Sequence, residues 1–178
     1  EFIGPLSESI RPHLTEDTHL LFSYHGLPVS HVKRIDRSKA HCQTVEACCT
    51  VKCEANSLCY GRHCNETTMA VVERLGLKPD QWSLSYQSRL GPVKWLEPST
   101  TQMVEALVKK GVKKLAIVAP AFLADGLETL EELDIGIREE FMEHGGTELK
   151  VINCLNDDEQ WVRGLEQLIA KEFEQAVA

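Results

Sequence analysis

Six of the seven cysteines lie within 23 residues, in the stretch CQTVEACCTVKCEANSLCYGRHC that runs from Cys42 to Cys64. Thiols at this density are typical of a metal cluster or a disulfide framework. Zinc sites usually pair their cysteines as C-x2-C, whereas the spacing here is C-x5-C-C-x3-C-x5-C-x4-C. Four thiolates also suit a 2Fe–2S cluster, whose ligand spacing is less uniform. The spacing thus weakens the case for zinc and leaves an iron–sulfur cluster, zinc and free or disulfide-linked thiols open.

Six cysteines exceed the four that such a cluster needs, so the ligand set stays open. Cys42 and Cys59 are the first choices, and at least one of the adjacent pair that follows Cys42 should join them. Cys53 is the expected spare, and Cys154 is expected to be a small buried residue. The candidate ligands are Cys42, Cys48, Cys49, Cys59 and Cys64.

A histidine and three carboxylates form a second group of candidates. His25 lies in SYHGLP, where glycine and proline predict a turn that leaves the imidazole at the edge of a sheet. Glu128 and Glu132 are four residues apart on a predicted helix, with Asp125 near the same line. Alternatively, the histidine only satisfies local backbone, and Asp125 and Glu128 form a helix-capping pair. If the helix begins at the edge that carries His25, these groups can ligate a metal or move protons.

Four β-rich runs position these side chains: residues 19–24, 82–87, 114–119 and 149–153. Helix-period sequence follows each run, and Ser99 with Gln102 forms a capping box in front of the second helix. This alternation predicts an α/β fold, a doubly wound parallel sheet of about four strands with helices on both faces. Residues 37–64 are predicted to be a cysteine-rich insertion within a single domain over residues 1–178.

Size and charge narrow the functional class. The 178 residues can bury a core without disulfides, and no positively charged, apolar signal segment opens the chain, so a reducing compartment is favoured. The net charge of -8 argues against a nucleic-acid partner. No apolar run approaches the ~20 residues that span a bilayer. The first residue is Glu1 rather than Met, and we expect the chain to be a fragment of a longer protein.

Three strings in order, HLLFSYHGLP (19–28), SYQSRLGPVKWLEPST (85–100) and PAFLADGLETLEELD (120–134), resemble the C-terminal half of ferrochelatase. That family inserts ferrous iron into protoporphyrin. The resemblance implies that His25 and Glu128 are catalytic and that these two residues, with Asp125 and Glu132, receive Fe²⁺. The residues that it places at the porphyrin cleft are Trp95, Gln87 and Arg89. It also implies a missing N-terminal domain of similar α/β architecture, and a 2Fe–2S cluster like that of bacterial relatives with an internal cysteine-rich insertion.

The resemblance leads us to expect a lyase of haem biosynthesis that converts protoporphyrin IX and ferrous iron to protohaem. We expect the fragment alone to be inactive. The expected location is the cytoplasm, with a peripheral contact at the inner membrane as a further expectation. The alternatives are a non-catalytic iron–sulfur or zinc sensor on a chelatase fold, and a chelatase for another metal or tetrapyrrole.

Overall fold

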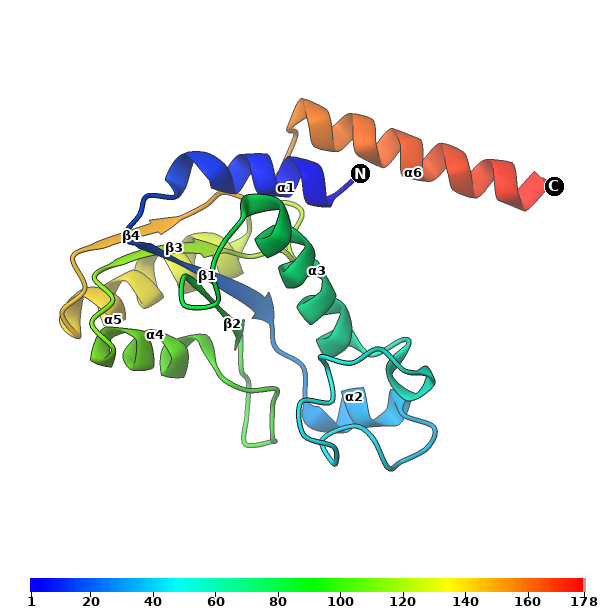
Figure 1. Ribbon diagram of the computed structural model, residues 1–178, viewed down its shortest axis with the longest axis horizontal. Coiled ribbons are helices and arrows are strands. Elements are labelled where there is room, and N and C mark those ends of the chain that lie inside the picture. The colour runs from blue at the N-terminus through cyan, green and yellow to red at the C-terminus, as the bar shows by residue number, and fades with distance from the viewer. Residues whose placement is uncertain (178) are drawn as a thin grey trace.

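A computed structural model describes residues 1–177 of the chain, and the side chains of residues 1–174. Its centre is a four-stranded parallel sheet in the order β2-β1-β3-β4, so that β1 and β3 are the inner strands (Figure 1). The strands are β1 (Thr18–His25), β2 (Trp82–Gln87), β3 (Lys114–Val118) and β4 (Glu148–Val151). The predicted α/β fold with a parallel sheet of about four strands is confirmed.

Helices cover both faces of the sheet. On one face lie α1 (Ile3–Ile10) and α3 (Tyr60–Leu75), and on the other lie α4 (Thr100–Lys109), the π-helix η3 (Glu128–Ile137) and α5 (Arg138–Glu143). Side chains on β1 alternate between these two cores: Leu20 and Phe22 pack with α1 and α3, and Leu21 packs with α4 and η3. The inner strands β1 and β3 are buried on both sides and are therefore mostly apolar, which is why they were recognisable in the sequence.

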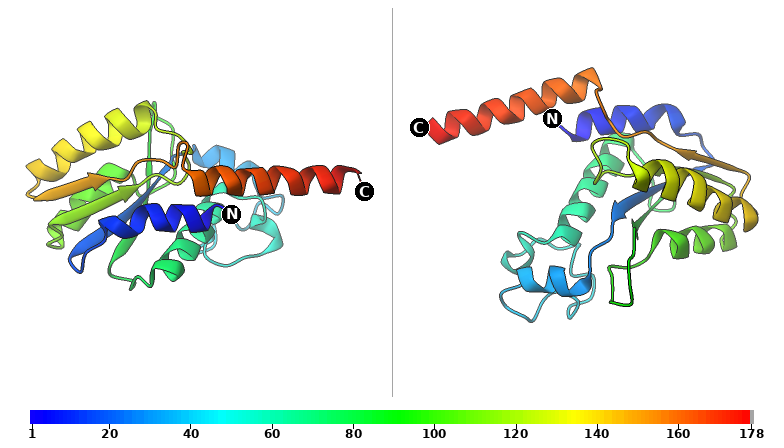
Figure 2. Two further views of the ribbon diagram at one scale, coloured as in Figure 1. Left: turned by 90° about the horizontal axis from the view of Figure 1, so that it is seen from above. Right: turned by 180° about the vertical axis from the view of Figure 1, so that it is seen from behind.

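The C-terminal helix α6 (Glu159–Val177) packs against the rest of the chain mainly near its start. Trp161 is buried there, and its ring meets Phe2 edge-on, with 5.6 Å between the ring centroids. The helix then extends away from the sheet in every view (Figures 1 and 2). None of the described helices is long and apolar enough to cross a membrane.

The connection from β1 to α3 carries the cysteines. It begins with the short helix α2 (Val29–Ile35) and continues with irregular chain through residue 59, apart from one 3-10 turn, η2 (Glu54–Asn56). Helix α3 begins at Tyr60, so residues 60–64 of the predicted insertion form the first turn of this helix. Residues 36–59, which we call the cysteine loop, lie with α2 beyond the carboxyl end of β1 (Figure 1).

The helix after β3 begins as a π-helix rather than as the ordinary α-helix that the pattern suggests. No side chain caps it, so the capping pair of Asp125 and Glu128 does not form. Instead, the Thr129 hydroxyl accepts a hydrogen bond from the Gly126 N–H at 3.0 Å. π-Helical turns occur often at functional sites, because the wider turn displaces side chains from their usual positions. By contrast, the predicted capping box of Ser99 and Gln102 at the start of α4 is present.

Candidate functional site

The carboxyl ends of the two neighbouring strands β1 and β2 define the site. In the sheet register His25 pairs with Gln87, and the Gly26 N–H donates to the Gln87 carbonyl at 2.8 Å. A Cβ atom on Gly26 would lie 2.7 Å from that carbonyl oxygen and 3.3 Å from the Trp95 ring. Glycine is therefore required at the turn after His25, because any side chain would push the turn off β2.

His25 keeps one ring nitrogen free for chemistry. Its Nδ1 donates to the Gly26 carbonyl at 2.6 Å, which places the proton of the neutral ring on Nδ1 and leaves Nε2 as an acceptor. The ring is half-buried and tilted against Phe122 from the loop after β3, with 6.0 Å between the ring centroids. The backbone therefore satisfies only one nitrogen of the imidazole.

Gln87 joins this edge to the π-helix. Its side chain is 2% exposed, its Oε1 accepts from the Ser23 hydroxyl at 2.7 Å, and its Nε2 donates to the Glu128 carbonyl at 2.8 Å. The resemblance places Gln87 at the porphyrin cleft, and in the structure its amide lies beneath that edge as a link between β1, β2 and η3. Glu128 is thereby held at the edge that carries His25.

The Glu128 carboxylate is half-buried and accepts no hydrogen bond from another described side chain or backbone group. Its Oε2 lies close to Gly126, where an added Cβ would approach it to 3.3 Å. A carboxylate with free lone pairs and an imidazole with a free nitrogen, both carried at this edge of the sheet, are suitable groups for binding a divalent cation or transferring protons.

The other two carboxylates are already engaged. Both oxygens of Glu132 accept hydrogen bonds from Ser88, from its N–H at 2.7 Å and its hydroxyl at 2.6 Å. Asp125 accepts from Asn156 at 2.8 Å and from the Cys154 N–H at 3.1 Å. Burial acts to raise the pKa of Asp125, but these hydrogen bonds outweigh it and lower the pKa below its ordinary value. Both carboxylates therefore fix loops around Glu128.

Trp95 and Arg89 lie on the loop that follows β2. Trp95 pairs with Pro28 in an isolated bridge, its ring packs beside Gly26, and its indole N–H is buried without a hydrogen-bond partner in the described chain. Arg89 is exposed and donates to the Leu96 carbonyl at 3.3 Å. The Trp95 ring thus lies near His25, whereas Arg89 braces its own loop.

Four cysteine thiols of the cysteine loop interact with one another. The sulfurs of Cys48 and Cys49 are 3.9 Å apart. The neighbouring Cys49 thiol lowers the pKa of Cys59, and the N–H groups of Arg62 and Gly61 at the start of α3 lower it further. Burial, and then the neighbouring thiols of Cys59 and Cys48, raise the pKa of Cys42 to about 11.

Free thiols are the donors that an iron–sulfur cluster requires. All seven cysteines are free, and Cys42, Cys48 and Cys59 are buried. Among the described residues, no three His, Cys, Asp or Glu side chains are spaced to hold one metal ion. A single tetrahedral zinc ion would need four sulfurs about 3.8 Å apart. A two-iron cluster takes two thiolates on each iron, so its four ligands can be more widely spread.

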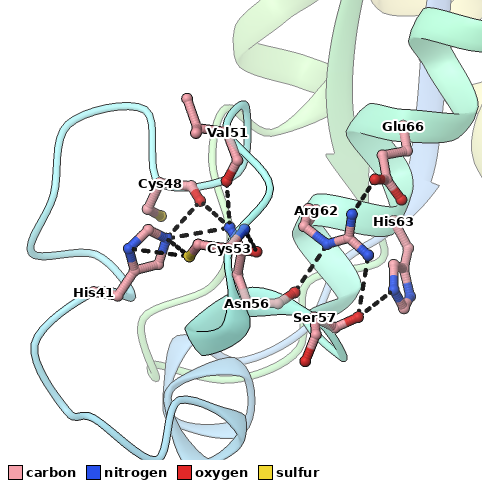
Figure 3. A network of polar contacts seen from close by, with 9 residues as sticks. All are labelled: His41, Cys48, Val51, Cys53, Asn56, Ser57, Arg62, His63 and Glu66. Atoms are coloured by element: carbon pink, nitrogen blue, oxygen red, sulfur yellow. Dashed lines mark hydrogen bonds and ion pairs between the residues drawn. The ribbon is translucent and has the colours of Figure 1, made fainter.

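A network of polar contacts holds the cysteine loop (Figure 3). The buried amide of Asn56 donates to the carbonyls of Cys48 and Val51, at 2.9 and 2.8 Å, and accepts from the Cys53 N–H at 3.0 Å. Arg62, which forms an ion pair with Glu66, donates to the Asn56 carbonyl at 2.9 Å. No sequence pattern predicted this role for Asn56.

The remaining three cysteines point elsewhere. The Cys53 sulfur lies 3.7 Å from His41 Nε2. Cys64 is buried in the first turn of α3, where burial raises the pKa of its thiol to about 12. Cys154 is half-buried after β4, and burial, followed by the charge of Asp125, raises its pKa to about 12.

The first turn of α3 connects the cysteine loop to His25. The Tyr60 hydroxyl donates to the His25 carbonyl at 2.8 Å. At the next residue, Gly61, an added Cβ would approach the Cys49 sulfur to 3.0 Å. Tyr60 follows the thiol of Cys59 directly, so the position of the sulfurs and the position of the histidine backbone depend on the same helical turn. The role of Tyr60 was not predicted from the sequence, although its position directly after Cys59 is a signal that could have indicated it.

The ferrochelatase family model matches residues 1–173. The chain belongs to the ferrochelatase family. It is 44% identical over 169 residues to the ferrochelatase of Pseudomonas syringae pv. syringae, and 45% identical over 170 residues to that of Pseudomonas fluorescens. Each alignment covers 94% of this chain and 50% of the relative. The chain therefore spans about half the length of the ferrochelatases it matches.

A solved structure with the same fold is a putative cobalamin (vitamin B12) biosynthesis CbiX protein from Marinobacter aquaeolei. It superimposes with a TM-score of 0.51 and 17% sequence identity, over 89% of this chain and 98% of that protein. At this identity the likeness establishes the fold alone. This chain, which spans about half the length of the ferrochelatases it matches, therefore has the fold of a protein that consists almost entirely of one such α/β unit.

Proposed function

We propose that this chain is the C-terminal half of an enzyme that inserts ferrous iron into protoporphyrin IX and releases protohaem. The observation that carries the proposal is the pairing, in a ferrochelatase-family chain, of His25 with a free Nε2 and Glu128 with an unengaged carboxylate. Gln87 links the two by pairing with His25 in the sheet and binding the Glu128 backbone.

Metallation requires that two pyrrole protons leave the macrocycle while Fe²⁺ exchanges its water ligands for four nitrogens. In our proposal His25 Nε2 accepts a pyrrole proton, because Nδ1 is already protonated and bonded to the Gly26 carbonyl. Glu128 binds the incoming Fe²⁺ or passes protons to solvent, since its oxygens are free of protein donors. The porphyrin would lie over this edge against Trp95.

We assign Asp125 and Glu132 mainly to positioning. Their oxygens are occupied by Asn156, Cys154 and Ser88, so Fe²⁺ would have to displace these donors before it could bind. Arg89 stabilises the loop that carries Trp95, because its guanidinium group donates a hydrogen bond to the Leu96 carbonyl. Gln87 acts through Glu128 rather than on the porphyrin.

We further propose that Cys42, Cys48, Cys49 and Cys59 hold a 2Fe–2S cluster. Such a cluster, when bound, is capable of one-electron transfer and also cross-links the chain that ligates it. The four thiols come from the start, the middle and the end of the cysteine loop, so joining them would fix its fold. Tyr60 would then hold the His25 backbone in place. Loss of the cluster would lower activity because this support is lost, and the cluster would take no part in electron transfer.

The partner of this chain in the proposal is the N-terminal half of the same protein, which would supply the other wall of the porphyrin cleft. Turnover therefore requires both halves, and the chain alone should metallate no porphyrin. We place the enzyme in the cytoplasm, where a peripheral contact with the inner membrane would bring it to its apolar substrate.

The catalytic assignment is tested by porphyrin metallation with the intact enzyme. His25→Ala and Glu128→Gln should each reduce kcat by at least about 100-fold, the usual effect of losing a general acid or base. Glu131→Gln is the matched control, because Glu131 is exposed on the same helix, and it should keep near-parental activity. Near-normal metallation by either of the first two variants would refute the assignment.

The cluster assignment is tested by visible absorption and by iron and sulfide analysis of protein purified without oxygen. Cys42→Ser or Cys59→Ser should abolish the absorption of the cluster. Cys53→Ser should retain it, because the Cys53 sulfur lies against His41. A colourless parent protein with one equivalent of zinc would show that the site binds zinc instead.

A further inference from the structure

A pocket of about 440 Å³ lies between helix α2 and the start of the cysteine loop. Its volume is within the range of small-molecule sites in proteins. Asp36 and Cys42 contribute to its lining, together with four basic side chains and two hydroxyl groups: Lys33, Arg34, Arg37, Lys39, Ser30 and Thr44. None of these residues takes part in the porphyrin edge, and only Cys42 belongs to the proposed cluster.

The charge of this segment opposes that of the whole chain. Residues 30–44 contain four basic residues and one acidic residue, a formal charge of +3, within a chain of net charge -8. The single carboxylate, Asp36, is used inside the loop. It accepts from the N–H and hydroxyl of Ser38 and from the N–H groups of His41 and Cys42, at 2.6 to 3.0 Å. Among the residues that the structure describes, no carboxylate forms an ion pair with the four basic side chains of the pocket.

The arginines make this imbalance clear. Six of the eight arginines in the chain form ion pairs with carboxylates, and the two that do not are Arg34 and Arg37. Lys33 and Arg34 lie in the last turn of α2, where they also complement the helix dipole. Arg37 and Lys39 lie beyond the helix, so the dipole does not account for them.

We propose that this pocket binds the phosphate group of an anionic ligand. Arginine guanidinium groups bind phosphate oxygens in pairs of parallel hydrogen bonds, and hydroxyls such as those of Ser30 and Thr44 donate to the remaining oxygens. A phosphate bound there would bridge α2 and residues 37–44, the segment that leads to Cys42. Binding of an anionic ligand would therefore stabilise the conformation of the cysteine loop.

Calorimetric titration of the intact protein with inorganic phosphate, at low ionic strength, tests the proposal. We expect saturable binding with a Kd no weaker than about 1 mM, and at least a tenfold loss of affinity in the double variant Arg34→Gln/Arg37→Gln. The matched control is Arg74→Gln/Arg163→Gln, which removes the same charge from two exposed arginines elsewhere and should bind like the parent. Circular dichroism establishes that each variant is folded.

Vesicles identify the source of the phosphate. If the ligand is a lipid headgroup, phosphatidylglycerol vesicles should bind the parent, phosphatidylcholine vesicles should not, and free phosphate should compete. If it is a soluble phosphate compound, inorganic phosphate should bind while neither vesicle does. Absence of saturable phosphate binding, equal loss in the control variant, or vesicle binding that phosphate cannot displace would each overturn the proposal. Binding is read without metallation, so failure here would leave the proposed enzyme activity untouched.

Discussion

Replacing Gln87 by leucine should destabilise the domain and impair the active site together. Leucine has a similar size, but it cannot accept from the Ser23 hydroxyl or donate to the Glu128 carbonyl. Ser23 keeps its contact with the Thr100 hydroxyl at 2.8 Å, so one polar group retains a partner. The Glu128 carbonyl loses the only side-chain donor that the structure gives it.

The magnitude follows from these contacts. Two hydrogen bonds contribute about 1 kcal/mol each. The expected loss is therefore about 2 kcal/mol in the free energy of unfolding. With a urea m-value of about 2 kcal/mol per molar, the unfolding midpoint should fall by about 1 M.

Urea denaturation followed by circular dichroism measures this shift, and Gln160→Leu provides the control because Gln160 is exposed on α6. Metallation by the intact enzyme should also slow, mainly through kcat, because Glu128 is no longer held at the His25 edge. A midpoint within about 0.3 M of both parent and control would refute the reasoning. So would full activity in a variant that is destabilised, since Gln87 would then have no positioning role.

Two further predictions concern the same edge. Gly26→Ala should cost about 1–3 kcal/mol, because its methyl group would lie 2.7 Å from the Gln87 carbonyl oxygen; Gly136→Ala, whose nearest neighbour would be at 3.8 Å, should unfold no more easily than the parent in urea. Asp125→Asn should reduce the slope of the melting temperature against pH on the acid side. The lowered pKa of Asp125 means that its carboxylate stabilises the fold above the unfolded value of 3.8, and that this contribution is lost as pH falls through the folded pKa. Asp157→Asn, an exposed neighbour, should retain the parental slope between pH 6 and pH 3, and an unchanged slope in Asp125→Asn would contradict the assignment.

The sheet was predictable because its signal is local. The inner strands β1 and β3 are buried on two faces, so the runs 19–24 and 114–119 stood out without any knowledge of their partners. The capping box at Ser99 is local in the same sense, since both of its hydrogen bonds join residues three apart. The placement of His25 at the sheet edge followed from its position after the first strand.

The π-helix and the engaged carboxylates were not predictable, because distant residues determine them. Asp125 and Glu128 have the spacing of a capping pair, yet Asp125 binds Cys154 and Asn156 from the loop after β4. Glu132 is held by Ser88, which has a left-handed backbone conformation at φ 62°. These contacts form only once the sheet has assembled, and the sequence pattern of a helix does not contain them.

Cysteine spacing alone also left the ligand set open, because the cysteine loop reverses direction several times. Positive φ angles at Lys39, Gln43 and Ala47 turn the chain, and Asn56 gathers the carbonyls of Cys48 and Val51. Sulfurs that are far apart in the sequence are thereby brought together.

The position of α3 explains how a cysteine loop can affect a site to which it contributes no catalytic group. Tyr60 and Gly61 are consecutive, and they contact opposite neighbours: the hydroxyl of one binds the His25 carbonyl, and the backbone of the other lies against the Cys49 sulfur. A Cβ on Gly61 would also approach the Tyr86 hydroxyl of β2 to 3.6 Å, so this turn has little room to shift. If the sulfurs are displaced, the first turn of α3 must move with them or hold them in place. Because Tyr60 in this turn binds the His25 carbonyl, the position of His25 changes only if the turn moves. A structural role for the proposed cluster needs no electron path, because this helical turn already couples the two sites.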